Sequence, residues 1–585
     1  MMDQELISFI KRESNACVGG EGSELAEARE SLKRRYLGFG YGSDGERRAR
    51  GLSTYVDRTV LETVEWAKPG IMALFSNADI IRFEPSCPAQ QQAAEDATLY
   101  VNHAVFGPRM FELVHSVLTD ALLQRVGWCL AHVVERRERR AARYAGLTRD
   151  EAVALMAAPG VDRSEGAMRL TRRDGENGPL FDLSLHREEL RRELRLDPVE
   201  PDQVIISADA PSVERARFVA FWQRKTASDL RREGFPQALI DTLPVCRSFT
   251  GPGSGADAGT SLGGMAGLPQ HGGALREYRV YEAWFDFDLD GDGIAEKLKA
   301  VYCAEGGQCV LLSVEEWPMY RAPLFAACSV PVPHQITGLC LADLVSDLQD
   351  LRSEMTRQYL DGLALANQGE LVVNEGRGDG GVEYDSLLAR GVGAVHRIRG
   401  DASITPLNVV TGAVDALRGI EMSGGLVERR TGISCRTQGV AAEALQRSAT
   451  GAAIAEEAMN QRLELIARIF AETFFKPLGR YVLHLVHRYH DKGLQMRLRG
   501  RFMRFDPLNW EPDMGISITA GLGAMSRLRQ MNIYKNILEI QEKFLKELGK
   551  ESPVQLPHIV RTCHELAKAA GLEAPERFFG SCESA

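Results

Sequence analysis

The sequence lacks the cysteine pattern of a disulfide framework or a zinc ribbon. Its eleven cysteines are scattered, and no CxxC pair occurs in its 585 residues. The closest pairs are Cys303 with Cys309 and Cys328 with Cys340, and neither has the spacing of a metal-ligand set. We therefore predict reduced thiols, as in a cytosol, and no bound metal or other cofactor.

Long hydrophobic runs are also missing. Ala121–Val134 is one of the most apolar windows, but Gln124 and Arg125 interrupt it and it is too short to cross a bilayer. The N-terminal MMDQELISFIKRES is amphipathic and contains acidic residues, unlike a secretory signal peptide. The sequence therefore predicts a soluble chain, or one that becomes part of a soluble assembly, with no membrane partner.

An excess of positive charge is absent as well, because the net charge is −10. Proteins that grip nucleic acid tightly usually carry a basic face that neutralises phosphates. Tight binding to nucleic acid is therefore not expected. A pore through which DNA slides is compatible with this composition, since such a surface should repel phosphate and keep only a few basic contacts.

Nucleotide-binding and catalytic patterns are missing or weak. No GxxxxGK[ST] motif occurs. Ser261 stands in a GxSxG sequence, but its glycine-rich flanks lack the strand and helix that hold a nucleophile elbow. His484, His487 and His490 recur at every third position of a predicted helix, and a helix surface explains them more simply than metal ligation.

The acidic loop LDGDG has two interpretations. Asp288, Asp290 and Asp292 stand at the first, third and fifth positions of a calcium loop, and Gly293 stands at the sixth. The twelfth position is Lys299 instead of a bidentate acid, and the flanking segments predict strands instead of helices. An ordinary Asp-Gly hairpin turn is the favoured interpretation, with a cation site as the alternative.

Three long helical patterns give the strongest positive signal. The first, at residues 341–367, has apolar residues close to a 3.6-residue period and acidic residues on the opposite face. The second, at 413–430, contains Gly424-Gly425, which predicts a kink or a close contact. The third, at 450–490, contains Pro477, which predicts a kink. The apolar stripe of the first helix is Leu344, Val345, Leu348, Leu351, Met355, Tyr359 and Leu363, and its acidic face is Asp343, Asp347, Asp350, Glu354 and Asp361.

The remaining periodicity predicts an α+β class that is mainly α. Residues 1–150 are expected to be mostly helical apart from a strand at Val126–Val134, and Arg136–Arg143 to start a helix with a solvated basic face. A polar helix is expected around Val213–Arg232, and the glycine-rich 251–274 is a surface loop or linker. Further predicted helices lie at 23–36, 52–75, 91–106, 111–125, 525–548 and 559–570, and further strands at 203–206, 279–288, 296–303, 371–374, 394–399, 403–407, 496–505 and 516–519.

Several ordered stretches resemble the portal proteins of short-tailed, podovirus-type bacteriophages. The closest matches are VPHQITGLCLADLVSDLQ, TGISCRTQGVAAEALQRSATG and QRLELIARIFAET. The segments RGLSTYVDRTVLETVEWAKPGIMALF, YEAWFDFDLDGDGIAEKLKAVY and ITAGLGAMSRLRQMNIYKNILEIQE resemble the family's opening segment, its central hairpin and the start of its C-terminal helical region. Two departures are a C-terminus shorter than the long helical barrel of some relatives and the segment 251–274, which matches no family segment.

The resemblance implies a portal fold with wing, stem helices, clip and a short helical crown, assembled as a ring. In that fold, residues 1–335 and 450–519 form the wing, which includes the loop 251–274 and the hairpin 279–303. Residues 336–368 and 413–433 form the two stem helices, 369–412 the clip, 434–449 a channel loop and 520–585 the crown. The implied DNA-channel residues are Arg436, Thr437, Gln438, Gln446 and Arg447, and the implied partner-docking residues of the clip are Glu375, Arg377, Asp379, Arg397 and Arg399.

The implied function is a DNA conduit at one capsid vertex, for genome packaging, head-tail connection and DNA ejection. The implied partners are eleven further copies in a dodecameric ring, double-stranded DNA in the channel, the terminase large subunit, the major capsid and scaffolding proteins, and a tail adaptor. The expected location is the virion, after assembly in the host cytoplasm, and no catalytic residue is expected. Two alternatives stay open: a helical phage scaffold or adaptor without a DNA channel, and a hydrolase that uses calcium or Ser261.

Overall fold

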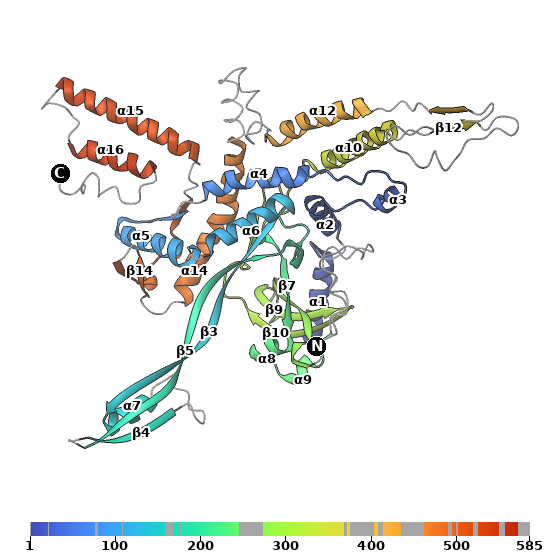
Figure 1. Cartoon of the computed structure of the whole chain (residues 1–585). Helices are drawn as coiled ribbons and strands as arrows, with labels where there is room; N and C mark the ends of the chain where they lie inside the picture. The colour runs from blue at the N-terminus through green and yellow to red at the C-terminus, as the bar shows by residue number, and fades with distance from the viewer. Residues whose placement is uncertain are drawn as a thin grey trace.

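The computed structural model describes residues 2–20, 23–75, 80–107, 109–157, 168–175, 178–244, 273–367, 371–374, 403–406, 413–433, 461–489, 494–498, 501–518, 524–548 and 556–570. It mixes helices and strands and has more helix than strand, in line with the predicted class. Three structures project from a central body (Figure 1): the helix pair α10 (Ser346–Asn367) and α12 (Ala413–Thr431), the helix pair α15 (Ala524–Leu548) and α16 (Leu556–Ala569), and a long ribbon of β3 (Gly127–Leu147) and β5 (Gly178–Val199).

The body is built around a helical core. α4 (Thr59–Leu74), α6 (Met110–Leu123) and α14 (Lys476–Tyr489) bury apolar side chains such as Ile71, Leu122 and Val482 against one another. Removing this apolar surface from water is the main source of stability for such a core. α2 (Glu24–Leu37) and α5 (Gln91–Tyr100) pack on the outside of the same core.

Segments far apart in the sequence meet in this body. β2 (Ile81–Glu84) pairs antiparallel with β16 (Gly515–Ile518). The local hairpin of β14 (Leu494–Leu498) and β15 (Arg501–Phe505) lies in the same C-terminal part. Tyr100 of α5 contacts the rings of Phe505 and Trp510, with centroids 5.8 and 5.5 Å away. The N-terminal and C-terminal parts of the chain therefore share one core.

A six-stranded antiparallel sheet lies beside the N-terminus (Figure 1), in the order β1-β6-β7-β8-β9-β10. α1 (Met2–Ala16) covers one of its faces, where Leu6 and Ile10 pack against Phe218 and Phe285. The predicted hairpin is confirmed as β8 and β9. The strand bounds are β1 Cys17–Val18, β6 Val204–Ser207, β7 Phe218–Thr226, β8 Glu277–Phe287, β9 Glu296–Glu305 and β10 Gln308–Glu316.

The ribbon corrects one prediction from the sequence. Arg136–Arg143 does not start a helix but continues the strand β3, and it pairs with β5 from Arg136↔Arg191 to Arg143↔Ser184. Cross-strand pairing outweighs local composition here, because a β-strand's preference depends on its neighbours more than a helix's does. The sheet of the ribbon has the order β11-β3-β5-β4, with β11 (Leu324–Ala327) at the root and β4 (Met168–Gly175) at the tip.

Two further helix predictions were wrong in extent. Val213–Arg232 is not one polar helix but the strand β7 followed by the short helix α8 (Ala227–Arg232), which starts with a capping box between Thr226 and Asp229. The apolar residues of β7 are consecutive, and its first four residues are all buried. The helix predicted from residue 52 begins only at Thr59, because the preceding residues run along α10.

The third long helix changes its geometry where Pro477 was predicted to kink it. Residues 461–470 are α-helical, Ala471–Phe475 form a π-helical stretch called η7, and α14 follows. Pro477 has no N–H to donate to the preceding turn, and wider hydrogen bonding just before it accommodates that loss. No helix among the residues that the structure describes is long and apolar enough to cross a membrane.

The remaining elements are short. They are the helices α3 (Asp44–Ala49), α7 (Arg149–Ala157) and α9 (Gln237–Ile240), the strands β12 (Leu371–Asn374) and β13 (Ser403–Pro406), the π-helical stretch η2 (Val101–Phe106), and the 3-10 turns η1 (Pro88–Gln90), η3 (Pro201–Gln203), η4 (Val213–Arg215), η5 (Gly273–Leu275) and η8 (Pro507–Asn509).

Candidate functional site

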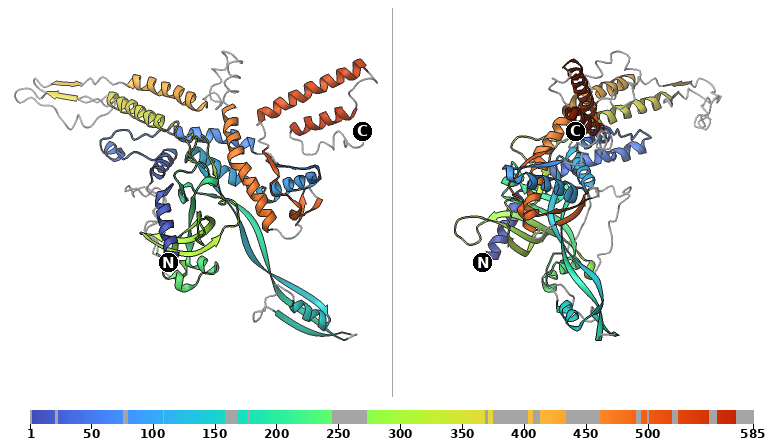
Figure 2. Two further views of the ribbon diagram at one scale, coloured as in Figure 1. Left: turned by 180° about the vertical axis from the view of Figure 1, so that it is seen from behind. Right: turned by 90° about the vertical axis from the view of Figure 1, so that its left-hand side faces the viewer.

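The helix pair α10–α12 is the candidate functional site. The two helices run antiparallel and project from the body, and the hairpin of β12 and β13 lies at their far end (Figures 1 and 2). At the near end, Arg430 of α12 contacts Asp347 of α10 at 2.6 Å and donates to the Leu344 carbonyl at 3.0 Å. The Arg430 guanidinium also lowers the pKa of the Asp347 carboxyl.

Gly419 lets the two helices approach closely. A Cβ atom at this position would lie 2.6 Å from the Sδ atom of Met355 on α10. Real Cβ atoms do not come this close to a neighbour, so any larger residue would push the helices apart or displace Met355. At the centre of the pair, the absence of a side chain at Gly419 therefore makes room for the flexible side chain of Met355.

The polar side of α10 is attached to the segment 35–60 of the body. This segment runs along α10, and both its side chains and its backbone amides form hydrogen bonds with side chains of the helix. Three ion pairs join the two: Arg35 with Asp350 at 2.8 Å, Arg47 with Asp361 at 2.5 Å and Asp44 with Arg357 at 2.9 Å. Two of the five acidic residues predicted for this face, Asp350 and Asp361, therefore bind the chain's own segment 35–60, whereas Asp347 pairs with Arg430 of α12.

Buried neutral side chains complete this attachment. Gln349 is fully buried, donates to the Arg35 carbonyl at 3.0 Å and accepts from the Val60 amide at 2.9 Å. The Ser353 hydroxyl accepts from the Asp57 amide at 2.9 Å. Buried polar groups are costly unless they are paired, so these contacts fix one register of the helix against the body.

Apolar side chains remain exposed on the same helix pair. The predicted stripe packs well only at its start, where Val345 and Leu348 are buried, whereas Leu351 is 39% exposed. The other exposed apolar residues of the pair are Leu360, Leu363 and Leu365 on α10 and Leu417 and Met422 on α12. An uncovered group of this kind typically marks a contact with another protein surface.

The sequence predicts a kink or a close contact at the glycine pair of α12, and a single copy shows neither a break in the helix nor a neighbour close to these glycines. The helix runs without interruption from Ala413 to Thr431, so Gly424 and Gly425 do not end it. A Cβ atom at either position would have no heavy atom within 4 Å. The predicted close contact is therefore absent among the described residues of a single copy.

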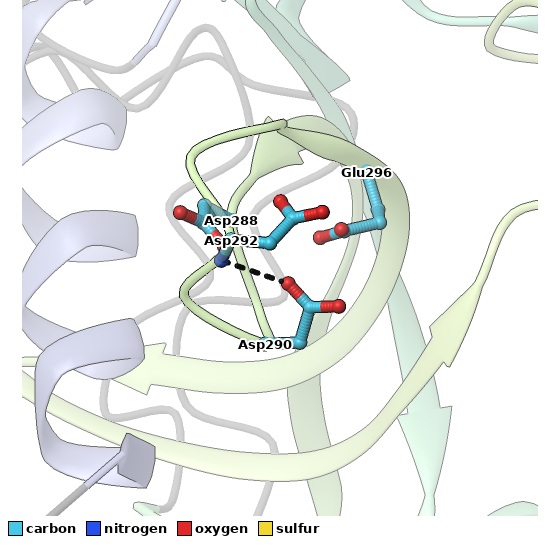
Figure 3. A group of neighbouring side chains, drawn as sticks. All are labelled: Asp288, Asp290, Asp292 and Glu296. Carbon is cyan, nitrogen blue, oxygen red and sulfur yellow. Dashed lines mark hydrogen bonds between the residues drawn. The ribbon is translucent and has the colours of Figure 1, made fainter.

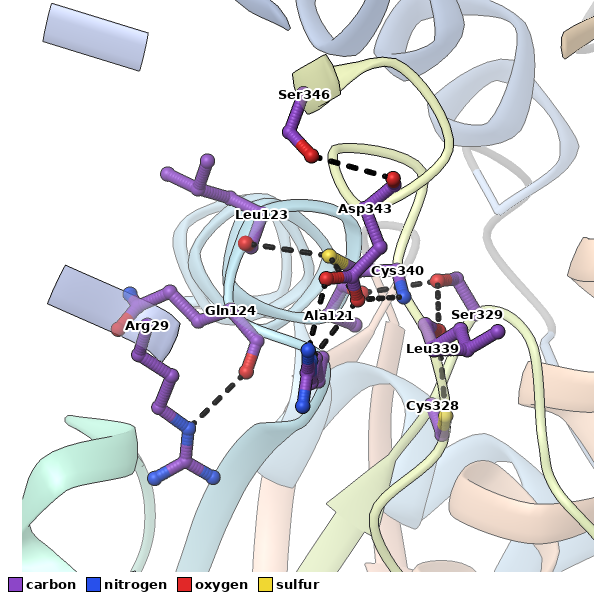
Figure 4. Close-up of polar contacts among 11 residues, drawn as sticks. Arg29, Ala121, Leu123, Gln124, Cys328, Ser329, Leu339, Cys340, Asp343 and Ser346 are labelled. Atoms are coloured by element: carbon purple, nitrogen blue, oxygen red, sulfur yellow. Dashed lines mark hydrogen bonds and ion pairs between the residues drawn. The ribbon is translucent and has the colours of Figure 1, made fainter. Parts of the chain in front are cut away.

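The root of α10 is fixed by the C-terminal end of α6 (Figure 4). A helix end leaves carbonyl groups without partners, and each of the last four here receives one from elsewhere in the chain. The donors are the Ser329 hydroxyl to Ala121 at 2.9 Å, the Ala342 amide to Leu122 at 3.1 Å, the Cys340 thiol to Leu123 at 3.4 Å and the Arg29 guanidinium to Gln124 at 3.2 Å.

An ion pair joins this root to the ribbon. Arg125, which lies two residues before β3, binds both carboxylate oxygens of Asp343 at 2.9 Å. Arg125 has a left-handed φ of 73°, a conformation that costs free energy for a residue with a side chain. The bidentate pair offsets this cost and raises the pKa of the Arg125 guanidinium. The helix pair and the ribbon therefore start from one hydrogen-bonded junction.

The site residues implied by the resemblance lie outside the described residues. This applies to the channel-loop residues Arg436, Thr437, Gln438, Gln446 and Arg447 and to the clip residues Glu375, Arg377, Asp379, Arg397 and Arg399. The structure does describe what flanks them. β12 and β13 pair from Leu371↔Pro406 to Asn374↔Ser403, so the chain leaves and re-enters the clip segment at one point.

The acidic loop between β8 and β9 has the hydrogen bonds of a turn. Carboxylate oxygens of Asp288, Asp290, Asp292 and Glu296 lie within 4.8 Å of one another (Figure 3). The Asp288 carboxylate accepts from the amides of Gly291 and Gly293 at 2.6 and 2.9 Å, and the other acids accept from nearby amides in the same way.

The twelfth position of a calcium loop carries a bidentate acid, whereas the residue at that position here is Lys299. Its side chain is paired with Glu282 at 3.1 Å, a residue of the neighbouring strand. The turn interpretation thus accounts for every contact that the loop makes, and the cation site stays a hypothesis.

The histidines do not converge in the described part of the chain. His484 lies 3.6 Å from Asp513, whereas His487 contacts the Pro507 carbonyl at 3.2 Å. His490 and Ser261 lie outside the described residues. The helix-surface interpretation of the two described histidines therefore fits their separate contacts.

Comparison with known proteins gives one family. The sequence model described as "Phage SU10 portal protein" matches residues 6–585. No curated protein matches the chain.

Proposed function

This chain belongs to the phage SU10 portal protein family and has a phage portal function in the virion, and we propose that copies of it form a closed ring around a DNA channel. The family is one of structural proteins. The further copies, capsid proteins, packaging motor and tail adaptor are its proposed partners, and twelve is the proposed copy number. Assembly in the host cytoplasm before incorporation into the virion is part of the same proposal.

The uncovered apolar surface of α10 and α12 carries the ring proposal. Leu351 and Leu365 stand two heptads apart, so they lie on nearly the same side of α10. Each is exposed in a single copy, as are Leu417 and Met422 on the partner helix. Contacts between two different surfaces of identical copies close into a ring when the rotation between copies allows it. Burial against the neighbouring copy removes these side chains from water.

The proposed domain roles follow the family. α10 and α12 act as the stem, residues 369–412 as the clip, 434–449 as the channel loop and 520–585 as the crown around α15 and α16. The wing is the body formed by 1–335 and 450–519. Arg436 and Arg447 are the proposed phosphate contacts, and the acidic balance of the chain favours a channel that holds DNA weakly.

A paired substitution tests the ring. Leu351→Asp with Leu365→Asp puts charge on the exposed side of α10 and leaves its attachment to segment 35–60 unchanged. We expect monomers at concentrations where the unmodified chain forms rings, measured by sedimentation velocity and negative-stain images. The matched control is Ile294→Asp, which changes an exposed apolar residue on the β8–β9 turn and should leave rings intact.

The result that contradicts the ring is a monomeric unmodified chain across a wide range of protein and salt concentration. Irregular aggregates without a central hole would favour the alternative of a scaffold without a DNA channel.

A further inference from the structure

The ribbon β3–β5 is the one projection that neither the stem nor the crown explains. Its strands pair without interruption from Trp128↔Val199 to Tyr144↔Leu183, which extends it for about 50 Å at the rise of a β-strand. Its root belongs to the body, where Trp128 and Leu324 pack against residues of the six-stranded sheet. Beyond the root it is two strands wide until β4 and α7 join at the tip (Figures 1 and 2).

A bare two-stranded ribbon of this length needs support. Isolated hairpins are only marginally stable in water, and a natural fold normally covers or pairs such an element. The tip has its own small core, in which α7 packs on β5 and buries Ala152, Leu183 and Leu185. The same tip exposes two apolar side chains, Val153 at 58% and Leu170 at 48%. The tip is thus a folded unit with an uncovered surface.

The charge pattern of the ribbon points to a protein partner. Between residues 127 and 199 every Lys or Arg position is an arginine, and acidic residues are interleaved with them along both strands. Glu135 and Arg192, for example, face each other across the strands at 2.9 Å. A nucleic-acid contact calls for an excess of one sign, whereas arginines mixed with acids suit a protein surface that carries both signs.

The direction of the ribbon identifies the partner. In all views the stem pair α10–α12 and the crown pair α15–α16 lie at one end of the molecule and the ribbon extends from the other end (Figures 1 and 2). In a ring whose stem lies near the axis, neighbouring copies lie beside one another, and an element that points away from the axis reaches what surrounds the ring. Around a ring built into a capsid vertex, that is the shell.

We infer that the ribbon is an outward arm whose tip, with Val153 and Leu170, docks on the coat-protein shell and holds the ring in its vertex. The inference rests on the proposed ring function. The partner is a coat-protein surface with a shallow apolar spot surrounded by charges of both signs. Such a contact combines a small apolar centre with a polar rim, as is usual for protein interfaces.

Two variants of the full chain test the arm. In the first, residues 135–192 are replaced by Asn-Gly, which closes a hairpin between the cross-strand partners Val134 and Glu193 and keeps the buried root. In the second, Val153→Asp and Leu170→Asp alter only the tip surface, so it decides the question if the first does not fold. The matched control is Leu275→Asp with Ile294→Asp, two exposed apolar residues outside the arm.

Each chain is co-expressed with the coat and scaffolding proteins of its own virus, and portal copies per purified shell are counted by quantitative mass spectrometry. We expect both arm variants to form rings of unchanged mass and to lose more than tenfold in incorporation, while the control stays at the unmodified level. A photo-crosslinking residue in place of Val153 should give adducts with the coat protein.

Several results would overturn the inference. Normal incorporation of both variants, or adducts only with scaffolding protein, would remove the coat protein as the partner. Loss of rings in both arm variants, or adducts with other copies of this chain, would make the arm a contact between copies and leave the proposed ring intact. Absence of rings for the unmodified chain would instead overturn the proposed function, and the inference with it.

Discussion

The stem pair and the arm start from the same junction and differ in almost every other respect. The stem's first helix is attached to the body along its polar side, through buried groups such as Gln349, Ser353 and Arg357, and it exposes leucines. The arm is attached only at its root and exposes charged residues on a self-paired ribbon. The stem thus has a surface that has to be covered by apolar atoms, whereas the arm can remain solvated until it meets a partner.

This difference indicates two kinds of assembly contact in one chain. Apolar contacts between identical copies suit a permanent ring, because obligate interfaces resemble a core cut in half. Charged, extended contacts suit a partner surface that carries charges of both signs. We expect variants of the two regions to range in effect from complete loss of an activity to changes of about 1 kcal/mol in the free energy of unfolding.

The largest effect is expected at the far end of the stem. Replacing residues 369–412 with a short Gly/Ser linker should preserve rings and abolish stimulation of the packaging ATPase, because β12 and β13 start and end at one point and contribute few core contacts. ATPase assays with the terminase of the same virus measure the loss.

A narrower variant assigns that loss to the proposed docking residues. Replacing only 375–402 with Asn-Gly keeps the β12–β13 pairs up to Asn374↔Ser403 and removes the segment that contains Glu375 and Arg399. It should behave like the longer replacement. Full ATPase stimulation by either variant would show that the clip does not dock the motor, and a chain that no longer folds would place the module in the core.

Two ion pairs, one from each region, should differ in how much they contribute to the free energy of unfolding. Arg357→Ala removes a buried guanidinium that contacts Asp44 at 2.9 Å and the Tyr55 carbonyl at 2.7 Å, and we expect a loss of about 3 kcal/mol in the free energy of unfolding. Arg192→Ala removes the exposed pair with Glu135 and should cost less than about 1 kcal/mol. Urea unfolding measures both.

Limited proteolysis locates the first of these effects. In Arg357→Ala the segment 38–58 should become the earliest cleavage site, since two of its contacts with α10 are lost. Gln358→Ala on the exposed side should leave the segment protected. Equal stability of the Arg357 and Arg192 variants would mean that the stem is not anchored by its polar side.

The sequence predicted the stem well and the arm poorly, for physical reasons. The period of Val345, Leu348 and Leu351 was sufficient to place α10 as a helix, although Leu351 remains exposed in a single copy. The arm depends on partners about 50 residues away, and a run such as Arg136–Arg143 has no apolar alternation to reveal a strand. The attachment of α10 to segment 35–60 was missed because it relies on polar contacts between residues roughly 300 positions apart.

The proposed site residues show the same limit. The two clip strands β12 and β13 were predicted correctly from their apolar composition. The roles of Arg436, Arg447 and the clip charges came from family resemblance, since a loop contact with a partner leaves no period in the sequence. Only an experiment on the assembled ring can test them.

That experiment is expected to have a moderate effect. Arg436→Ala with Arg447→Ala should reduce DNA packaging or retention several-fold while rings form normally, because two weak phosphate contacts per copy are lost. Packaged DNA per virion measures the change, and the reduction should shrink as salt rises. Arg217→Ala with Arg232→Ala, two exposed arginines elsewhere, is the charge-matched control. Packaging equal to that control would exclude these residues as channel contacts.

The smallest effect separates two glycines of the same stem helix. Gly419→Ala should destabilise the unassembled chain by about 1 kcal/mol, since overpacking against Met355 outweighs the better helix propensity of alanine. Gly424→Ala meets no atom within 4 Å and should stabilise it by about 0.5 kcal/mol. Both are measured by urea unfolding in the Leu351→Asp, Leu365→Asp background.

In the ring, Gly424→Ala should be destabilising. Adjacent glycines weaken a helix, and they are useful where the backbone of a neighbouring copy packs closely against them. We expect faster ring dissociation for this variant in the unmodified background. If the ring became more stable by the same amount as the isolated chain, neighbouring copies would not pack against this side of α12.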